Sequence, residues 1–381
     1  MKILFTGGGT AGHIMPIIAV ARELRSKAAG DLRLFYLGPK DEFSEKLLSQ
    51  EGITMNFIFG GKLRRYFDPK SFFKNAVDVF FKIPLGFFQA FYHIFLISPD
   101  IILSKGGYGS LPTVLAGWFL LTPVFLHESD VVPGLANKIM SRFSLEIFAS
   151  FPVEKTEYFP RKKMLFVGNP IRAEILLGSL KEAEGVFRLK GGKPLILVLG
   201  GSQGSQRIND VLLAILPDLL VQFEIIHQTG AKNLGEIEAE TNIVLAPKGA
   251  SGEKLQDYYH ARPFLEEPEL KHAFAAADLV ISRAGSGTIF EIAALGKPSL
   301  LIPLPEAAQN HQLKNAYVFA SSGACQVLEE SNLTPRFFLE RVKYLLGTPD
   351  KLAQMAESAR EFSKPLSAKL IADYIEEYLN Q

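Results

Sequence analysis

The chain has 381 residues, 48% of them hydrophobic, and a formal net charge of +1 at pH 7. A single core seldom grows beyond roughly 250–300 residues, so the length predicts two domains. The near-zero charge gives a nucleic-acid partner no electrostatic support at the level of the whole chain. The single cysteine, Cys325, excludes an intramolecular disulfide framework and fits a reducing compartment.

The sequence begins directly in an expected strand, MKILFTGGG, with no signal-peptide hydrophobic region or cleavage site. Two spans without charged residues, 83–99 and 106–127, resemble membrane helices in composition. The first is shorter than the ~20 residues of a crossing and contains Pro84, and the second is punctuated by Gly, Pro, Ser and Thr. We therefore expect a soluble protein, or one that associates with the membrane surface.

The chain opens as a βαβ unit with four expected parts: a strand at 2–6, a glycine loop at 7–12, a helix at 13–27 and a strand at 32–37. The loop matches the G-x-G-x-x-G pattern of dinucleotide sites, which is a weak signal alone. The second strand runs into Gly38-Pro39-Lys40 instead of the acidic residue that would hold an adenosine ribose, which disfavours a NAD-dependent dehydrogenase. The glycines leave Thr10 and His13 near the carboxyl end of the sheet, where open α/β folds bind ligands.

Segment 57–95 holds eleven of the thirty Phe residues. Its aromatics recur at roughly helical spacing around an expected break at Pro84, a pattern that most often belongs to a core. The doublets Phe72-Phe73, Phe80-Phe81 and Phe87-Phe88 are, however, hard to bury on one helix face. The alternative is an amphipathic surface whose aromatics dip into lipid while interleaved basic residues meet anionic headgroups. Those basic residues are Lys62, Arg64, Arg65, Lys70, Lys74 and Lys82.

Two more expected strands end in glycine-rich or polar sequence. Strand 100–104 leads into Lys105-Gly-Gly-Tyr-Gly-Ser110, and strand 123–126 leads into His127-Glu128-Ser129-Asp130. Polar residues directly after an apolar strand are more often functional than structural in this fold class. A further strand is expected at 145–149.

The pattern restarts after a strand at 164–167 and the segment Gly168-Asn169-Pro170-Ile171-Arg172. The second half has these expected elements: strand 194–199, glycine loop 200–205, helix 209–220, strands at 224–228, 242–246 and 261–265, and a helical tail from Thr334 whose last helix is 368–379. The economical interpretation is two doubly wound α/β domains. We place them at 1–167 and 168–365, with 366–381 as a helix that packs back on the first domain.

The stretch 277–312 carries the most specific chemistry. Strand 279–282 is followed by a turn of small residues at 283–287, a helix at 288–295 that Gly296 ends, and a strand at 299–303. Such a turn presents free N–H groups and a positive dipole end, which suits a diphosphate. Glu291 lies one helical turn further on, where its carboxylate can accept hydrogen bonds from a ribose diol. The alternative is an ordinary βα turn with a solvated glutamate.

Taken in order, six motifs resemble those of the MurG family of bacterial glycosyltransferases: GGGTAGHIMP, KGGYGS, HESD, GNPIR, GGSQGS and SRAGSGTIFEIAALGKP…NHQ. Enzymes of that family move N-acetylglucosamine (GlcNAc) from UDP onto undecaprenyl-pyrophosphoryl-N-acetylmuramoyl-pentapeptide (lipid I), making lipid II for peptidoglycan. The resemblance spans residues 7–312 and implies the two-domain GT-B fold. It also implies an N-terminal acceptor domain, a C-terminal UDP-sugar domain and a reaction in the cleft between them.

The resemblance places His13 at the active centre, where a neutral imidazole suits the base that takes the acceptor hydroxyl proton. The alternative for His13 is a residue that caps a helix N-terminus, and Glu128 and His127 are the rival acid/base candidates. The residues implied for UDP-GlcNAc are Thr10, Ala11, Gly12, Asp130, Arg172, Ser202, Leu265, Gly285, Ser286, Gly287, Thr288, Ile289, Phe290, Glu291, His311 and Gln312. Those implied for the acceptor side are Gly106, Gly107 and Tyr108. The family usually has Asn where this chain has Asp130, and a carboxylate cannot donate hydrogen bonds as an amide does.

The chain contains no Asp-x-Asp, so we expect no cofactor and no required divalent metal; helix dipoles and Arg172 would supply positive charge for the leaving UDP. The expected partners are UDP-GlcNAc, lipid I, an anionic membrane surface and cell-wall synthesis proteins, with no nucleic acid. The expected location is peripheral, at the cytoplasmic face of the bacterial plasma membrane. One alternative is a GT-B enzyme with another lipid acceptor, such as diacylglycerol. Another is a non-catalytic sugar-nucleotide-binding subunit, against which the presence of both half-sites argues.

Overall fold

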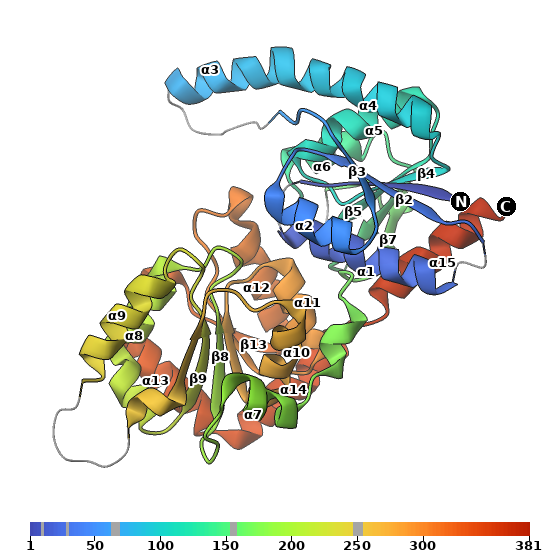
Figure 1. The fold of residues 1–381 in the computed structure, drawn as a ribbon. Helices are drawn as coiled ribbons and strands as arrows, with labels where there is room; N and C mark the ends of the chain where they lie inside the picture. Colours follow the sequence, from blue (N-terminus) through green and yellow to red (C-terminus); the bar gives the residue numbers. More distant parts are fainter. Residues whose placement is uncertain (9–10, 28–29, 62–68, 153–157, 247–253) are drawn as a thin grey trace. The chain divides into compact units, whose positions relative to one another are not determined.

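The computed structural model describes residues 1–8, 11–27, 30–61, 69–152, 158–246 and 254–381 (Figure 1). The chain forms two compact units, each built on its own parallel sheet. Unit 1 comprises Met1–Arg172 and Lys364–Gln381, and unit 2 comprises Ala173–Ser363. The first unit therefore extends to Arg172, where the sequence analysis places the boundary at 167.

The sheet of unit 1 has seven described strands, all parallel, in the order β3-β2-β1-β4-β5-β6-β7. Their bounds are β1 Lys2–Thr6, β2 Arg33–Gly38, β3 Thr54–Phe57, β4 Ile101–Ser104, β5 Val124–Glu128, β6 Glu146–Ala149 and β7 Met164–Phe166. The order reverses between β1 and β4, whose last residues, Thr6 and Ser104, are paired in register. Open α/β sheets bind ligands at such a switch point, beyond the carboxyl ends of the strands.

The helices of unit 1 form two layers, one on each face of the sheet. One layer comprises α1 (Ala11–Lys27), α2 (Glu42–Gln50) and α15 (Ser367–Leu379), and the other comprises α4 (Ile83–Ile97), α5 (Leu111–Phe119) and α6 (Leu135–Met140). Successive strand residues alternate between the layers: Ile3 and Phe5 pack with the first, and Leu4 with the second. Burial on both faces explains why these strands are continuous apolar runs.

The last helix, α15, completes the core of unit 1. Its buried residues Ala368, Ile371, Ala372 and Ile375 recur at helical spacing and pack with α1. The Tyr374 and Tyr378 rings lie edge-on to Phe125, with ring centroids 5.7 and 5.2 Å away. Lys27 of α1 forms an ion pair with Asp373. The C-terminal segment is therefore part of unit 1, although it follows unit 2 in sequence.

A long helical rod runs from α3 (Pro69–Val77) through η1 (Asp78–Lys82) into α4 (Figure 1). The expected break at Pro84 is absent. Residues 78–82 form one turn of π-helix, in which the Ile83 N–H donates to Asp78 O, five residues back. Pro84 then occupies the first turn of α4, where a missing N–H is tolerated. The π-helical turn before α4 thus accommodates Pro84 without a break in the rod.

The sheet of unit 2 has six described strands, all parallel, in the order β10-β9-β8-β11-β12-β13. Their bounds are β8 Leu195–Leu199, β9 Glu224–Gln228, β10 Tyr259–Arg262, β11 Leu279–Ser282, β12 Ser299–Leu301 and β13 Cys325–Val327. The order reverses between β8 and β11, where Leu199 and Ser282 are paired. The loops that follow these two strands flank a second switch point.

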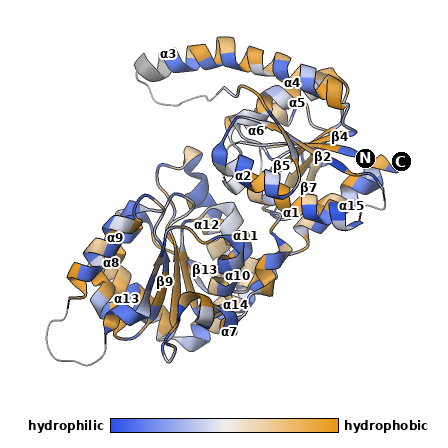
Figure 2. Cartoon of the chain, in the orientation of Figure 1, coloured by the Kyte–Doolittle hydropathy of each residue, from blue (hydrophilic) through white to orange (hydrophobic). Residues whose placement is uncertain are grey.

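The described helices of unit 2 are α7 (Leu180–Phe187), α8 (Gln206–Leu220), α9 (Leu234–Val244), α10 (Glu267–Ala276), α11 (Ser286–Ala294), α12 (His311–Ser321), α13 (Pro335–Leu346) and α14 (Pro349–Phe362). Figure 2 shows the hydrophobic strands of this sheet inside helices with hydrophilic outer faces. The strand expected at 242–246 is wrong, because those residues end α9 and begin the following turn. Ile243, which made the run look like a strand, is 74% exposed.

Candidate functional site

The imidazole of His13 lies between two glycine loops at the switch point of unit 1. Gly8 N donates to Gly106 O at 3.1 Å, which joins the loop after β1 to the loop after β4. Gly106 and Gly107 have φ of 84° and 83°, a conformation that favours glycine. A Cβ on Gly107 would lie 3.1 Å from His13 Nε2, and one on Gly8 would lie 3.2 Å from Nδ1. The structure thus brings His13 to Gly106 and Gly107 of the acceptor-side set.

The other candidates of these two loops are placed less fully. Tyr108 begins a 3-10 turn directly after Gly107 and is half-buried. Gly12 is exposed in the first turn of α1, where Ala11 is the first helical residue. Thr10 lies outside the described residues.

Glu128 is a buried carboxylate that is tied to the same loops. It ends β5, is 4% exposed, and accepts hydrogen bonds from Asp130 N at 2.9 Å and Asn137 Nδ2 at 2.6 Å. Asn137 Oδ1 in turn accepts from Gly107 N at 2.9 Å. Burial and the charge of Asp130 raise the pKa of Glu128 above its usual range. Two hydrogen bonds of Asn137 therefore connect Glu128, whose pKa is raised, to Gly107 beside His13.

His127 is not placed to act as an acid or base. It is 1% exposed within β5, and its Nε2 donates to Gly168 O at 3.2 Å. Burial and the nearby charge of Lys105 hold the pKa of His127 well below its usual range, so it is neutral at pH 7. Its bond to Gly168 joins β5 to the segment that follows β7.

In unit 2, the loop after β11 leads into a helix whose N-terminus is open to an anion. α11 begins at Ser286, and its N-cap, Gly285, provides no side-chain hydrogen bond. The first turn contains no acidic residue, and its N–H groups at Ser286, Gly287 and Thr288 have no acceptor within the helix. A Cβ on Gly285 or Gly287 would meet nothing within 4 Å. Backbone donors, a positive dipole end and unfilled space together fit a phosphate group.

Other residues implied for the donor differ in what they can offer. Glu291 lies one turn beyond Gly287 and is half-buried. Ile289 and Phe290, by contrast, are 0% and 2% exposed, and the Phe290 ring packs on Phe362 at 5.6 Å. Their side chains belong to the core, and the Ile289 N–H donates to Gly285 O at 3.0 Å within the first turn of α11, so neither residue offers a side chain to a ligand.

Gln228, which sequence reasoning missed, joins one donor candidate, Leu265, to the residue before another, Ser202. It ends β9; its Nε2 donates to Gly201 O at 2.8 Å, and its Oε1 accepts from Leu265 N at 2.9 Å. The N–H of Leu265 is thus used within the protein, which leaves its carbonyl for a ligand. Ser202, the next residue after Gly201, is exposed.

A second missed group, the Glu330 cluster, consists of Ser205, Arg207, Arg283 and Glu330. The Glu330 side chain is 2% exposed and receives hydrogen bonds from the guanidinium groups of Arg207 and Arg283. Arg283 also donates to Ser205 Oγ at 2.6 Å and to Ile302 O at 3.2 Å. Arg283, three residues before α11, is therefore bonded to the segments that follow β8, β12 and β13, and Glu330 balances its charge.

The remaining candidates lie at other loop ends. Gln312 Oε1 accepts from Leu304 N at 3.0 Å, and His311 Nδ1 donates to Ala308 O at 2.8 Å. The two residues before them, Gln309 and Asn310, have φ of 58° and 54°, strained values of the kind that gather at functional sites. In unit 1, Asp130 is half-buried and Arg172 is 6% exposed.

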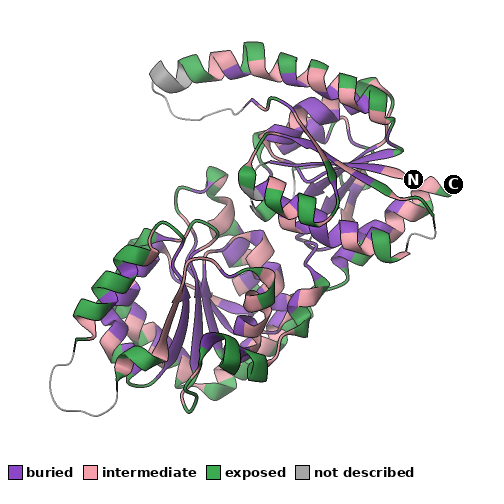
Figure 3. Ribbon diagram, in the orientation of Figure 1, coloured by how far each residue is buried: buried purple, intermediate pink, exposed green. Residues whose placement is uncertain are grey.

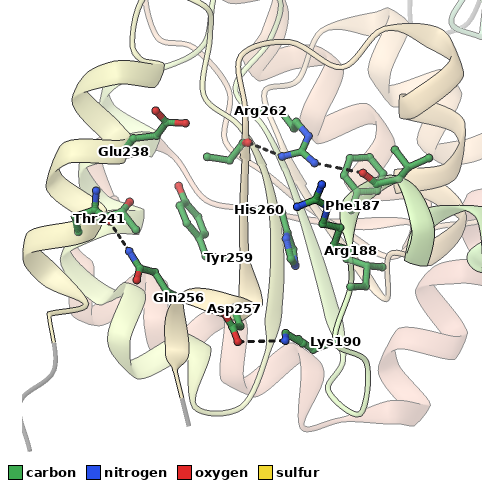
Figure 4. Close-up of a pocket in the computed structure, with 14 residues that line it drawn as sticks. Phe187, Arg188, Lys190, Glu238, Thr241, Gln256, Asp257, Tyr259, His260 and Arg262 are labelled. Atoms are coloured by element: carbon green, nitrogen blue, oxygen red, sulfur yellow. Dashed lines mark hydrogen bonds and ion pairs between the residues drawn. The ribbon is translucent and has the colours of Figure 1, made fainter.

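A hollow of about 990 Å³ lies elsewhere in unit 2, along the outer edge of β10 (Figure 4). Its charged walls include Arg188, Glu238 and Arg262, and Lys190 pairs with Asp257 at 3.2 Å. No candidate residue is among those that line it. The hollow therefore has no part in the site described above.

Comparisons with known proteins agree with this arrangement. Residues 3–149 match the glycosyltransferase family 28 N-terminal domain, and residues 195–371 match the family 28 C-terminal domain. The chain is 37% identical over 345 residues to a UDP-N-acetylglucosamine–N-acetylmuramyl-(pentapeptide) pyrophosphoryl-undecaprenol N-acetylglucosamine transferase of Bacillus cereus, covering 90% of this chain and 91% of that one. It is 36% identical over 378 residues to the enzyme of that name from Clostridium tetani, covering 99% and 98%.

Solved structures show the same fold. A crystal structure of MurG from Acinetobacter baumannii superposes with a TM-score of 0.72 at 27% identity, over 99% of each chain. A UDP-GlcNAc 2-epimerase from Neisseria meningitidis superposes with a TM-score of 0.68 at 15% identity, a likeness of fold alone. The expected GT-B fold is confirmed. The chain belongs to glycosyltransferase family 28, within the family of N-acetylglucosamine transferases called MurG.

Proposed function

We propose that this enzyme transfers GlcNAc from UDP-GlcNAc to the C4 hydroxyl of the N-acetylmuramoyl group of lipid I, giving lipid II. The observation that carries the proposal is the pair of switch points. One has an open helix N-terminus for a diphosphate, and the other has an imidazole against a glycine turn that a buried carboxylate holds through Asn137. The relatives are named for this transfer, and their sequences match over nine-tenths of the chain or more.

In this proposal, unit 2 holds the donor. The N–H groups of Ser286, Gly287 and Thr288 bind the diphosphate, and Glu291, one turn further along α11, accepts hydrogen bonds from the ribose hydroxyls. The Leu265 carbonyl, fixed by Gln228, is available to the uracil. The α11 dipole and Arg172 stabilise the negative charge that develops on the leaving UDP, so the proposal requires no divalent metal.

Unit 1 supplies the base. As the acceptor oxygen forms its bond to the sugar C1, His13 takes the hydroxyl proton, and the electron pair of the C1–oxygen bond leaves with UDP. Glu128 acts behind it: through Asn137 it fixes the Gly107 turn against the imidazole, and its ionised form stabilises the imidazolium.

The acceptor is a lipid, and the rod of α3, η1 and α4 gives unit 1 a surface suited to a membrane. Its exposed aromatics include Phe80 and Phe81, 73% and 64% exposed, and Phe88 and Phe95, each 68% exposed. Figures 2 and 3 show the rod as largely hydrophobic yet largely exposed or half-buried. The buried residues of α4, Gly86, Ala90 and Ile94, lie on one side of that helix, and the Ala90 and Ile94 side chains pack in the core with α5.

Among the described residues, one helical segment, Phe73–Ile97, is long and apolar enough to cross a bilayer. Because one side of α4 packs in the core of unit 1, we expect the rod to lie in the plane of the membrane surface and not to cross the bilayer. Its exposed aromatic side chains would then insert among the lipids. Lys74 is exposed and is placed to meet an anionic headgroup, whereas Lys82 is half-buried and pairs with the buried carboxylate of Asp78 at 2.7 Å. Lys62, Arg64 and Arg65 lie outside the described residues. We therefore place the enzyme at the cytoplasmic face of the plasma membrane, where cell-wall synthesis proteins are the expected partners.

One assay tests the proposal: radiolabelled UDP-GlcNAc is incubated with a lipid I analogue or with diacylglycerol, each with and without EDTA. The expected result is label in lipid II, unchanged by EDTA. Label in diacylglycerol alone would assign a different acceptor. UDP binding without transfer to either lipid would mean a non-catalytic subunit.

A further inference from the structure

The carboxyl ends of β4 and β5 enclose a lysine that the roles above do not use. Lys105 follows β4 and is 4% exposed, and its Nζ donates a hydrogen bond to Ser129 Oγ. Ser129 stands between Glu128 and Asp130 in the sequence, and the negative charges of both carboxylates act on the ammonium group. A buried ammonium is costly unless negative charge compensates it.

The charged and titratable groups that face Lys105 lie on β5, directly after it, and on α1. Glu128 and Asp130 lie at the end of β5, His127 lies within that strand, and His13 lies on α1. Burial lowers the pKa of Lys105, whereas the charges of Glu128 and Asp130 oppose that effect. Lys105 and His13 flank the same glycine: a Cβ on Gly7 would lie 3.4 Å from His13 Cβ and 3.7 Å from Lys105 Cβ.

The negative charge of Asp130 favours the charged form of Lys105 but opposes the ionisation of Glu128. The Asp130 N–H donates to Glu128 Oε1, but the negative charge of its side chain makes ionisation of Glu128 harder. Asn137 donates to the other oxygen of Glu128, and Lys105 supplies the positive charge. Without that charge, two anions two residues apart would compete for one proton.

We propose that Lys105 is a positioning residue that balances the charges of Glu128 and Asp130, and so keeps Glu128 ionised behind His13 during sugar transfer. The inference rests on the proposed function and adds to it a charge pair. It also explains how this chain accepts Asp130 where the family usually has a neutral Asn: the additional carboxylate is matched by a buried lysine.

Opposite shifts in the pH dependence of kcat test the inference. Lys105→Met removes a positive charge, so Glu128 and His13 hold their protons to higher pH. The acid limb of the kcat profile should move up by about one pH unit, so that kcat at a given pH on that limb should fall by up to about tenfold. Asp130→Asn removes a negative charge and should move the limb down. The double variant should return it close to the wild-type position.

A control removes a lysine of unit 2 that is half-buried. Lys297 donates to the carbonyls of Ala275 and Ala277, at 3.1 and 2.8 Å. Lys297→Met also loses a hydrogen-bonded ammonium, and its pH profile should coincide with that of the wild type. The KM for UDP-GlcNAc should stay within about twofold in Lys105→Met, because the lysine acts on proton transfer and not on donor binding.

The outcomes separate this inference from the function on which it rests. A wild-type enzyme that transfers no sugar to the lipid I analogue at any pH removes the proposed function itself. An active wild type whose profile coincides with that of Lys105→Met overturns the role of Lys105 alone. If Lys105→Met does not fold, the double variant decides: a cooperative thermal transition and a profile near wild type support charge balance, and failure of the double variant as well contradicts it.

Discussion

Glu330→Ala is the sharpest test of how the donor loops are held. The substitution leaves the guanidinium of Arg283, whose side chain is 11% exposed, without its carboxylate. Breaking a buried ion pair from one side costs about 3–5 kcal/mol. The second partner, Arg207, contributes little to the free energy of unfolding, because its side chain is 64% exposed. For a unit of this size, each kcal/mol shifts Tm by about 2–4 °C, so the unfolding transition of unit 2 should move down by about 6–20 °C.

The assay combines differential scanning calorimetry with UDP titration. UDP affinity should fall in Glu330→Ala, because Arg283 no longer fixes Ser205 and the turn before α11. Glu330→Gln keeps an uncharged acceptor and should lose less stability. Glu329→Gln is the matched control: that neighbouring carboxylate accepts a hydrogen bond from the exposed Tyr317 hydroxyl and takes no part in the Glu330 cluster. If Glu330→Ala melts within about 2 °C of Glu329→Gln, the cluster does not hold these loops.

The other predictions address one role each. Glu291→Ala should weaken UDP binding by about 1–3 kcal/mol in calorimetry, as expected for a lost charged hydrogen bond; unchanged affinity would disprove the ribose contact. His13→Ala should depress kcat by roughly 10²–10⁴-fold with UDP affinity nearly retained, and near-normal turnover would eliminate it as the base. Replacing Phe80 and Phe88 by Ser should reduce co-sedimentation with anionic liposomes without altering UDP affinity, whereas Phe337→Ser in unit 2 should change neither. Equal sedimentation of all variants would remove the membrane role of the rod.

The strands and their loops were predictable because their signals are local. A strand buried on both faces reads as a short apolar run, and the glycine turn after it ends the run unambiguously. β9 was predicted residue for residue at 224–228, and the start of α11 was placed within two residues. The prediction of a strand at 242–246 was wrong although it used the same signal, a short apolar run, as the correct ones. Residues 243–246 are a short apolar run, and only their place at the end of α9 shows that they are not a strand.

The partners of the site residues could not be predicted, because they are distant in sequence. Glu330 meets Arg283 across 47 residues and Arg207 across 123. Lys105 meets Ser129 across 24 residues. The motifs that contain them, KGGYGS and HESD, are each visible in the sequence, but their contact is not. Periodicity reports which face of an element is buried, but it carries no information on which distant polar group will lie opposite. Gln228 is the exception, because a polar residue at the end of an apolar strand is a signal that could have been read.

The two glycine-rich switch points look alike in sequence but are used differently. In unit 1, a Cβ on Gly106 would overlap the Asn137 amide, and one on Gly107 would press on His13. Those glycines leave room for two of the protein's own side chains, Asn137 and His13, and His13 is the proposed base. In unit 2, a Cβ on Gly285 or Gly287 would meet nothing within 4 Å, so packing does not require glycine there. The space is left for something outside the chain to approach the backbone, as a diphosphate at a helix N-terminus would. This contrast is what the proposed function requires, with the base at the filled loop and the nucleotide at the open one.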